Sequence, residues 1–262
     1  MAVLFEVVRD ALRERRPAAL ATVIDGPNLG AKLLLEPGRP PQGSLGDPDL
    51  DRVVARDMAG ELAAGRTGVR HYGPQGQAND ERLKVFIESY ASPPEMLIFG
   101  AVDFTAALCA AAKGLGYRVT VCDAREVFAT RSRFPLADDV VVDWPNRLLG
   151  RVGGQLGPAD AVCVLTHDPK FDVPAIMAAL ETDVGYLGVM GSRATHARRM
   201  KRLAEEGITD PRDLGRIMAP IGLDIGARTP EETAIAVCAE IISLRTGRAG
   251  GSLRDTAGPI HG

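Results

Sequence analysis

The segment Gly191-Ser192-Arg193 carries the residue types of an anion-binding site. It follows the apolar residues 186–190 and precedes residues 194–206, whose apolar spacing predicts a helix. The first backbone N–H groups of a helix are unpaired, and a serine hydroxyl and a guanidinium beside them add further donors. The serine can also act as a plain N-cap, so both roles stay open for it. We expect Gly191, Ser192 and Arg193 to contact a bound anion.

A second group of reactive side chains, Thr166-His167-Asp168, follows the apolar residues 161–165. His167 is a candidate acid–base group, because imidazole changes its charge near neutral pH. Its alternative role is that of a structural histidine held by hydrogen bonds. Lys170 follows as a candidate phosphate contact. We therefore include Thr166, His167 and Asp168 in the candidate site.

Gly100 and Asp123 stand where a dinucleotide-binding fold places its phosphate loop and its ribose contact. Gly100 follows the apolar residues 96–99, and Asp123 ends the next apolar segment 23 positions later. However, Val102 stands where the second glycine is needed, and Asp103 adds a negative charge to the loop. NAD(P) is therefore the less favoured cofactor, and a small NAD(P)-dependent oxidoreductase is the alternative function.

Two further polar positions join the candidate site. Arg125 follows Asp123 by two positions, and the two side chains can hold a polar heterocycle or pair with each other. Asp224 lies between Gly222 and Gly226 in an otherwise apolar loop, where close backbone geometry is expected. A structural crossover loop is the alternative for this segment.

The elements that must position these residues alternate regularly after residue 95, which predicts a parallel sheet. The expected strands are residues 96–99, 118–122, 140–142, 161–165 and 185–190. The expected helices are residues 104–115, 146–152, 174–180 and 194–206, followed by a final helix. We expect the strand at 161–165 beside the strand at 96–99, so that three strand ends converge on one crevice.

Two helices have specific boundary signals. Asp172 is expected to cap the helix that begins near Pro174. Thr229-Pro230-Glu231-Glu232 is a capping box that starts the final helix. In that helix we expect Ile235, Cys238 and Ile242 to form one apolar face, flanked by Ala234, Val237 and Ile241.

The residues before this region have a different pattern and predict a smaller α+β domain. Its expected helices are residues 4–15 and 49–64, and its expected strands are residues 19–24, 31–35, 70–72 and 83–87. The fold class is therefore α/β, a Rossmann-like doubly wound parallel sheet with a smaller N-terminal α+β domain. The expected domains are residues 1–88 and 95–246, and residues 247–262 are expected to form a disordered tail.

Composition narrows the classes of partner. The chain has 262 residues with 31 basic and 34 acidic side chains, and this balance does not favour nucleic acid. No stretch approaches the ~18 apolar residues of a membrane span, and the first residues lack signal-peptide features, so we expect a cytoplasmic protein.

The four cysteines are far apart and are expected to be reduced core residues. No metal-ligand spacing is present, so we expect no metal site of the chain's own.

Three of these motifs together resemble the xanthine dehydrogenase accessory factor (XdhC/CoxI) family. They are Thr166-His167-Asp168 with Asp172, the pattern Gly188-x-x-Gly191-Ser192-Arg193, and the run from Pro220 to Glu232 that reads Pro-Ile-Gly-Leu-Asp-Ile-Gly-Ala-Arg-Thr-Pro-Glu-Glu. The resemblance covers residues 96–245. The first 73 residues resemble a diverged form of the family's N-terminal domain, through Ala21-Thr22-Val23 and Gly30-Ala31-Lys32.

The resemblance implies a non-catalytic chaperone that binds molybdenum cofactor (molybdopterin). Such a protein assists sulfuration of the cofactor or its insertion into a molybdenum hydroxylase apoenzyme of the xanthine or carbon monoxide dehydrogenase type, often as a homodimer. Gly191-Ser192-Arg193 would take the cofactor's phosphate, and Asp123, Asp168 or Asp224 would accept hydrogen bonds from ring N–H groups.

This chain departs from the family pattern at two places. The family's N-terminal domain commonly has a cysteine in a glycine-rich stretch, but residues 43–48 here contain no cysteine. This argues against direct thiolate ligation of molybdenum from that domain. The loop after the first Rossmann strand commonly reads Gly-Ala-Gly-His and here reads Gly100-Ala101-Val102-Asp103, which further disfavours a dinucleotide.

Overall fold

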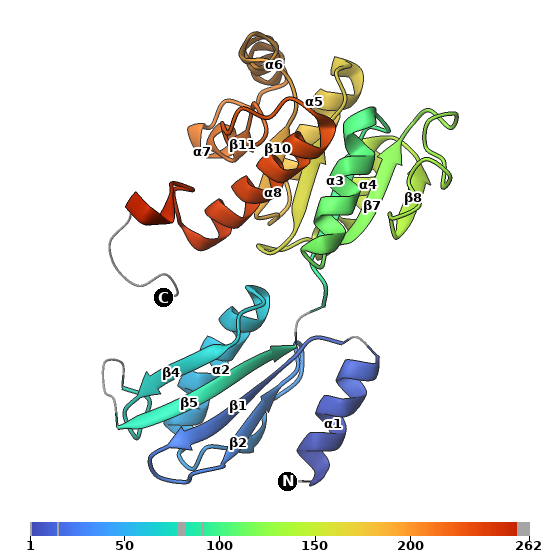
Figure 1. Ribbon diagram of the computed structural model, residues 1–262. Coiled ribbons are helices and arrows are strands. Elements are labelled where there is room, and N and C mark those ends of the chain that lie inside the picture. The colour runs from blue at the N-terminus through green and yellow to red at the C-terminus, as the bar shows by residue number, and fades with distance from the viewer. Residues whose placement is uncertain (1, 15, 78–81, 91, 256–262) are drawn as a thin grey trace. The chain divides into compact units, whose positions relative to one another are not determined.

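A computed structural model describes residues 2–14, 16–77, 82–90 and 92–255 of the chain. The chain divides into two compact units, Met1–Ser92 and Pro93–Gly262 (Figure 1). Among the described residues, no helix combines the length and apolar character needed to cross a membrane. Of the predicted disordered tail, residues 256–262 lie outside the described residues, and Leu253–Asp255 forms a short 3-10 helix.

The first unit is a five-stranded antiparallel sheet with strand order β3-β2-β1-β5-β4. The strands are β1 (Ala18–Asp25), β2 (Lys32–Leu35), β3 (Gln42–Ser44), β4 (Gly68–Tyr72) and β5 (Leu83–Tyr90). The helices are α1 (Ala2–Arg13) and α2 (Pro48–Ala63). Ala19 and Ala21 pack in the cluster that contains α2, whereas Ala18 packs with α1, so the two helices cover opposite faces of the sheet. The sequence did not predict the short strand β3.

The second unit is a six-stranded parallel sheet with strand order β11-β10-β9-β6-β7-β8. The strands are β6 (Glu95–Phe99), β7 (Arg118–Asp123), β8 (Asp139–Val142), β9 (Ala161–Val164), β10 (Tyr186–Val189) and β11 (Ile217–Met218). The helices are α3 (Asp103–Gly114), α4 (Pro145–Val152), α5 (Pro169–Leu180), α6 (Arg193–Glu205), α7 (Pro211–Gly215) and α8 (Pro230–Thr246), with a 3-10 turn η1 (Gly153–Gln155) after α4.

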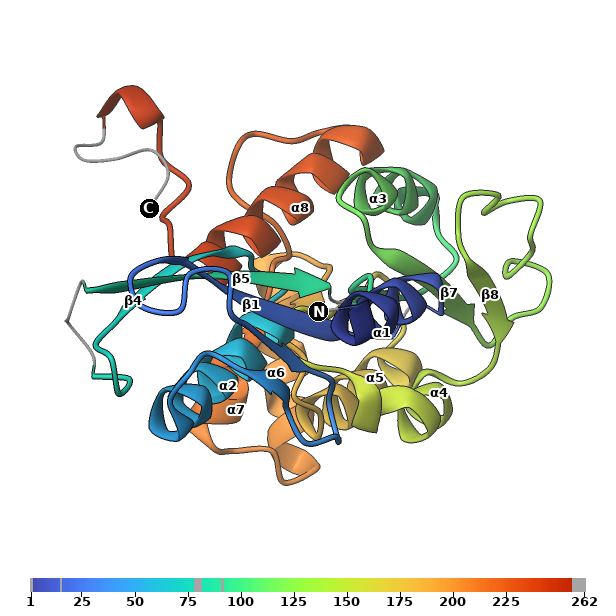
Figure 2. The ribbon, with the colours of Figure 1, turned by 90° about the horizontal axis from the view of Figure 1, so that it is seen from below.

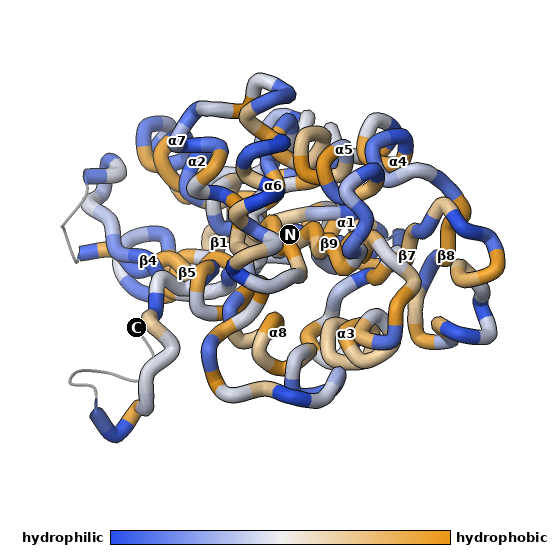
Figure 3. Tube along the Cα trace, turned by 90° about the horizontal axis from the view of Figure 1, so that it is seen from above, coloured by the Kyte–Doolittle hydropathy of each residue, from blue (hydrophilic) through white to orange (hydrophobic). Residues whose placement is uncertain are grey.

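Helices cover both faces of this sheet. One face packs against α3 and α8, and the other packs against α4, α5 and α6. Figure 2 shows these two helical layers on either side of the strands. The strand β9 is buried along its whole length, and Figure 3 shows its hydrophobic trace between the two layers. The predicted doubly wound α/β fold with an N-terminal α+β domain is confirmed.

The strand order reverses between β6 and β9, which are hydrogen-bonded neighbours. The chain proceeds outward from β6 through β7 and β8, returns through α4, and then proceeds the other way through β9, β10 and β11. The predicted pairing of residues 161–165 with residues 96–99 is therefore confirmed, with Phe99 opposite Val164. Ligands of doubly wound sheets bind beside the carboxyl ends of the strands at this reversal.

The start of α5 differs from the prediction. The helix begins at Pro169, and Asp168 is its N-cap, accepting a hydrogen bond from the N–H of Lys170. The prediction that Asp172 caps a helix near Pro174 is wrong, because the earlier Asp-Pro pair already supplies the cap and the first helical residue. Asp172 instead lies in the first turn of α5 and is buried. Pro174 lies inside the helix.

The buried face of α8 also differs from the prediction. The capping box of Thr229 and Glu232 is present as expected. However, Ile235 is 57% exposed and Ile242 is 37% exposed, whereas the smaller Ala234 and Val237 are buried in the cluster that contains α3. Small side chains on both helices allow α3 and α8 to approach closely, and this turns the two isoleucines outward.

Candidate functional site

The three predicted strand ends converge at the carboxyl edge of the sheet. The N–H of Leu165 donates to the carbonyl of Phe99 at 2.8 Å, and the N–H of Met190 donates to the carbonyl of Val164 at 2.8 Å. A Cβ placed on Gly100 would lie 2.7 Å from Cγ2 of Thr166. The loops after β6, β9 and β10 therefore lie side by side along one edge of the sheet, as predicted from the sequence.

A buried ion pair joins α5 and α6, the helices that follow two of these loops. Arg199 on α6 donates from Nη2 to the Asp172 carboxylate at 2.9 Å and to the carbonyl of Met190 at 3.0 Å. Both charged side chains are only 4% exposed. Thr166 donates its hydroxyl to the same carboxylate. The network fixes the start of α5 and the middle of α6 against the ends of β9 and β10.

The hydrogen bonds of this network only partly compensate for the burial of its charged groups. Burial raises the pKa of the Asp172 carboxyl above its ordinary value, although hydrogen bonds from Thr166 and Arg199 oppose the rise. Nη1 of Arg199 is buried and has no hydrogen-bond partner among the described residues. A buried charged donor without a partner carries a desolvation cost.

A cavity of about 180 Å³ lies beside the ion pair, between α5 and α6. Its lining comes from the loop after β9 and from both helices. The lining residues are His167, Pro169, Asp172, Val173, Thr195, Arg198, Arg199 and Arg202. Three guanidinium groups and one carboxylate give this cavity a net positive charge.

The first turn of α6 has the predicted cap. Ser192 accepts a hydrogen bond from the N–H of Thr195 at 3.1 Å, and Gly191 precedes it at a φ of +139°. The side chain of Arg193 is exposed and makes no hydrogen bond or ion pair within the described part of the chain. Its guanidinium is therefore available to an anion at the helix start.

Asp123 and Arg125 pair with each other. The Asp123 side chain is 2% exposed and accepts from the backbone N–H of Arg125 and from its guanidinium at 2.8 to 2.9 Å. It also accepts from the N–H of Ala101 at 2.8 Å. Burial alone would raise the pKa of the Asp123 carboxyl, but these hydrogen bonds outweigh burial and lower it below its ordinary value.

Three N–H groups of the loop after β6 already have partners inside the protein. The N–H of Gly100 donates to the carbonyl of Cys122, that of Ala101 donates to Asp123, and that of Val102 donates to the Thr105 hydroxyl. A dinucleotide site needs these amides for phosphate and the strand-end carboxylate for ribose. The amides of Gly100, Ala101 and Val102 and the carboxylate of Asp123 are already engaged inside the protein, which disfavours a dinucleotide.

The remaining predicted residues are distributed around the same edge. His167 is exposed and lines the cavity between α5 and α6. Asp168 is 46% exposed, caps α5 and lies 3.2 Å from Nζ of Lys170. Asp224 is exposed and makes no hydrogen bond within the residues that the structure describes.

The loop that carries Asp224 is held against the end of β10 and against α8. The N–H of Ile221 donates to the carbonyl of Val189, and the N–H of Gly222 donates to Glu240 at 2.9 Å. A Cβ on Gly188 would lie 2.5 Å from the Ile221 side chain. The absence of a side chain on Gly188 thus leaves room for this loop.

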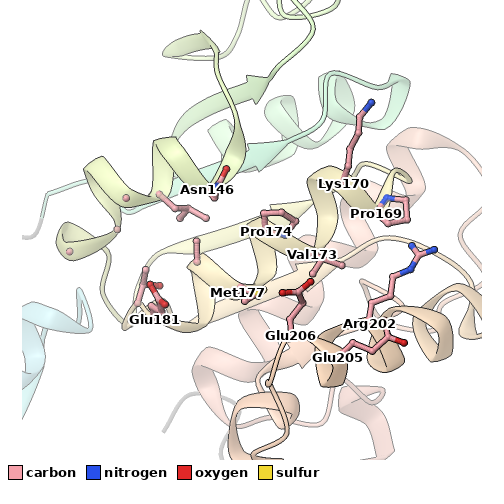
Figure 4. A pocket seen from close by; sticks show the side chains of 16 residues that line it. Asn146, Pro169, Lys170, Val173, Pro174, Met177, Glu181, Arg202, Glu205 and Glu206 are labelled. Atoms are coloured by element: carbon pink, nitrogen blue, oxygen red, sulfur yellow. The ribbon is translucent and has the colours of Figure 1, made fainter.

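An open groove of about 850 Å³ crosses the outer surface of α5, between α4 and α6 (Figure 4). Figure 4 shows Lys170 and Arg202 at one end of this groove and Glu181 at the other. Pro174 and Met177 lie on its floor. Arg202 lines both this groove and the smaller cavity, so the two spaces adjoin.

Sequence reasoning missed three cavity residues, Arg198, Arg199 and Arg202. Together with Thr195 they recur at intervals of three and four along α6, which places them on one face of the helix. This spacing could have been recognised in the sequence. The face of α6 that packs against α5 could not be predicted, because it depends on how the two helices meet in the fold.

The residues available to a metal ion are few. Within the described ranges, no group of three or more histidine, cysteine, aspartate or glutamate residues is placed to hold a metal. All four cysteines are buried and free, as the sequence predicted. Burial raises the pKa of Cys109 and of Cys122 to about 12 and that of Cys238 to about 11, so their thiols stay protonated at neutral pH.

Known proteins are similar to this chain in sequence and in fold. A Bacillus subtilis protein, named as a probable subunit of xanthine dehydrogenase, is 34% identical over 166 residues, which are 63% of this chain and 47% of that protein. The "Molybdenum cofactor insertion chaperone PaoD" of Escherichia coli is 36% identical over 91 residues, 35% of this chain and 28% of that protein. The matched segments thus span less than half of these curated relatives.

A crystal structure of a xanthine dehydrogenase from Bacillus halodurans is similar in fold. Its TM-score is 0.55 at 21% identity, over 95% of this chain and 97% of that chain. The sequence model of the XdhC Rossmann domain matches residues 96–241, and the model of the XdhC and CoxI family matches residues 11–73. The chain belongs to the XdhC and CoxI family.

Proposed function

We propose that this chain is an accessory protein that binds molybdenum cofactor and assists its insertion into a xanthine dehydrogenase-type molybdenum hydroxylase. The observation that carries the proposal is the donor-rich carboxyl edge of β9 and β10 in a chain of this family. The Escherichia coli relative named as a molybdenum cofactor insertion chaperone supports the same assignment.

The cofactor's phosphate would lie at the start of α6. The free N–H groups of the first helical turn, the Ser192 hydroxyl and the Arg193 guanidinium would contact it. Gly191 at positive φ lets the chain turn into the helix without a side chain over this position. Such contacts bind an anion strongly but reversibly, which suits a carrier.

The pterin ring offers N–H donors that need carboxylate acceptors. Asp168 is half-exposed and Asp224 is exposed at this edge, and both retain acceptor capacity. The Asp123 carboxylate, in contrast, is already engaged by Arg125 and Ala101. Gly100 and Thr166 would shape the floor of the crevice through their mutual contact. His167 would add a donor at the cavity mouth.

The buried thiols bear on sulfuration of the cofactor. Sulfur transfer through a protein requires a reactive thiolate, and the four cysteines of this chain are buried with raised pKa values. We therefore place the sulfur donor on a partner enzyme, with this chain presenting the cofactor. The resemblance to the family further supports a homodimer as the working form.

Purification from a molybdenum-replete host tests the proposal. The purified chain should carry molybdenum, measured by mass spectrometry, and a pterin, measured by the fluorescence of its oxidised form. Protein that contains no pterin and also fails to bind added cofactor would overturn the proposal.

A further inference from the structure

The cavity between α5 and α6 has the charge of a site for a dianion. Arg198, Arg199 and Arg202 bring three positive charges to a space of about 180 Å³, and Asp172 offsets one of them. Thr195 adds a hydroxyl to the lining. Like charges gathered around a small space repel one another unless an anion lies among them.

Arg199 supplies an independent indication of a ligand. Its side chain is 4% exposed and is held by Asp172 and by the carbonyl of Met190, both through Nη2. Nη1 is buried without a partner among the described residues, and Arg199 is one of the residues that line the cavity. Proteins rarely leave a buried guanidinium donor unused, because the lost hydration is not regained.

The space suits a tetrahedral oxyanion. A water molecule occupies about 30 Å³ of liquid, so the cavity holds a phosphate-sized ion with room for contacts on several sides. The adjoining groove over Pro174 and Met177 lets an organic group attached to that ion leave the cavity along α5 (Figure 4). Arg202 stands at the junction of the two spaces.

We propose that the cavity lined by His167, Thr195, Arg198, Arg199 and Arg202 is a binding site for a tetrahedral oxyanion, either the phosphate of a monoester or a free inorganic anion. The site lies on the other side of α6 from the proposed cofactor contact at Arg193, and its lining residue Thr195 is hydrogen-bonded to Ser192. Arg193 and Arg202 are nine positions apart, which is two and a half turns of helix and places them on opposite sides of α6.

Calorimetric titration of the full chain with inorganic phosphate, at low ionic strength, tests the site. Arg198→Ala and Arg202→Ala remove exposed side chains and leave the buried pair of Asp172 and Arg199 in place. Each should weaken phosphate binding about tenfold or more, since a hydrogen bond to a charged group is lost. Lys201→Ala is the matched control, because Lys201 is exposed on the same helix and does not line the cavity.

The source of the oxyanion is resolved by a second titrant, phenyl phosphate. If a monoester is the ligand, phenyl phosphate binds more tightly than inorganic phosphate, and Met177→Trp, which fills the groove, removes only that advantage. Equal affinity for both anions, unchanged by Met177→Trp, supports the same site with a free anion as its ligand.

The proposal is overturned if wild type binds neither anion, or if Arg198→Ala and Arg202→Ala bind phosphate as tightly as wild type and Lys201→Ala. These titrations use no pterin, so their failure leaves the cofactor proposal standing. Equally, loss of cofactor binding with phosphate binding retained would remove the proposed function alone.

Discussion

Gly100 and Thr166 lie so close that no side chain fits between them. A Cβ on Gly100 would come within 2.7 Å of Cγ2 of Thr166 and 3.0 Å of its backbone nitrogen, and Gly100 has a φ of +111°. The contact joins the loops after β6 and β9 at the reversal of strand order. It therefore fixes the spacing of these two loops at the carboxyl edge of the sheet.

Gly100→Ala should destabilise the second unit by about 2–4 kcal/mol, the combined cost of a positive φ and of overpacking. The chain's single tryptophan, Trp144, lies in this unit, so its fluorescence during urea unfolding reports this unit alone. Gly114→Ala is the control, because a Cβ there meets nothing within 4 Å. Equal unfolding midpoints for the two variants would contradict the close contact.

The pair of Asp172 and Arg199 gives a second prediction. Asp172→Ala leaves the Arg199 guanidinium buried and uncompensated, and should cost about 3–5 kcal/mol in the free energy of unfolding. The double variant Asp172→Leu with Arg199→Met should lose less free energy of unfolding than Asp172→Leu alone or Arg199→Met alone. A double variant whose loss equals the sum of the single losses would show that the two residues are not coupled.

The lowered pKa of Asp123 predicts a pH dependence of stability. A carboxyl whose pKa is lower in the folded state stabilises the fold above its unfolded value, near 3.8, and loses that contribution as pH falls through the folded value. Asp123→Asn should therefore be less stable than wild type at neutral pH. The difference should narrow as pH falls below about 4. A gap that stays constant down to pH 2 would contradict the interpretation.

The buried cysteines predict chemical inertness. Because burial raises the pKa of all four thiols, a disulfide reagent at pH 8 should modify none of them in the folded chain and all four in urea. Rapid reaction of any thiol in the folded chain would contradict this prediction and would favour a direct role of that cysteine in sulfur transfer.

The occupied phosphate loop predicts that nicotinamide cofactors do not bind. The N–H groups of Gly100, Ala101 and Val102 all have partners inside the protein. Titration with NAD⁺ and NADP⁺ to millimolar concentration should give no heat and no change in Trp144 fluorescence. Binding that is lost in Asp123→Ala would instead support the oxidoreductase alternative.

Much of the second unit was predictable because its signals are local. Apolar strands that alternate with helical patterns predicted the parallel sheet, and the order of β6 and β9 followed from the rules for such sheets. The two-residue strand β11 and the five-residue helix α7 were missed, because such short elements show no periodicity. The start of α5 differs from the prediction because two prolines, Pro169 and Pro174, can both stand in a first helical turn, and the Asp168 cap selects Pro169.

The site was predicted less completely than the fold. The positions of Gly191, Ser192 and Thr166 at the carboxyl edge of the sheet were predictable because these residues follow strand ends, where ligands bind in this architecture. Their contact with a ligand stays a prediction. The buried pairing of Asp172 with Arg199 depends on the packing of α5 against α6, which no local pattern encodes. The same packing places the exposed side chains of Arg198 and Arg202 at the edge of a cavity.

Binding of molybdenum cofactor at the carboxyl edge of the second unit, as proposed above, is tested most directly by titration. Cofactor released anaerobically from a molybdenum enzyme is titrated into wild type and Arg193→Ala. Wild type should bind the cofactor, and Arg193→Ala should bind it about tenfold or more weakly at an unchanged unfolding midpoint. Failure of wild type to bind, or equal affinity of the two proteins, would contradict the account.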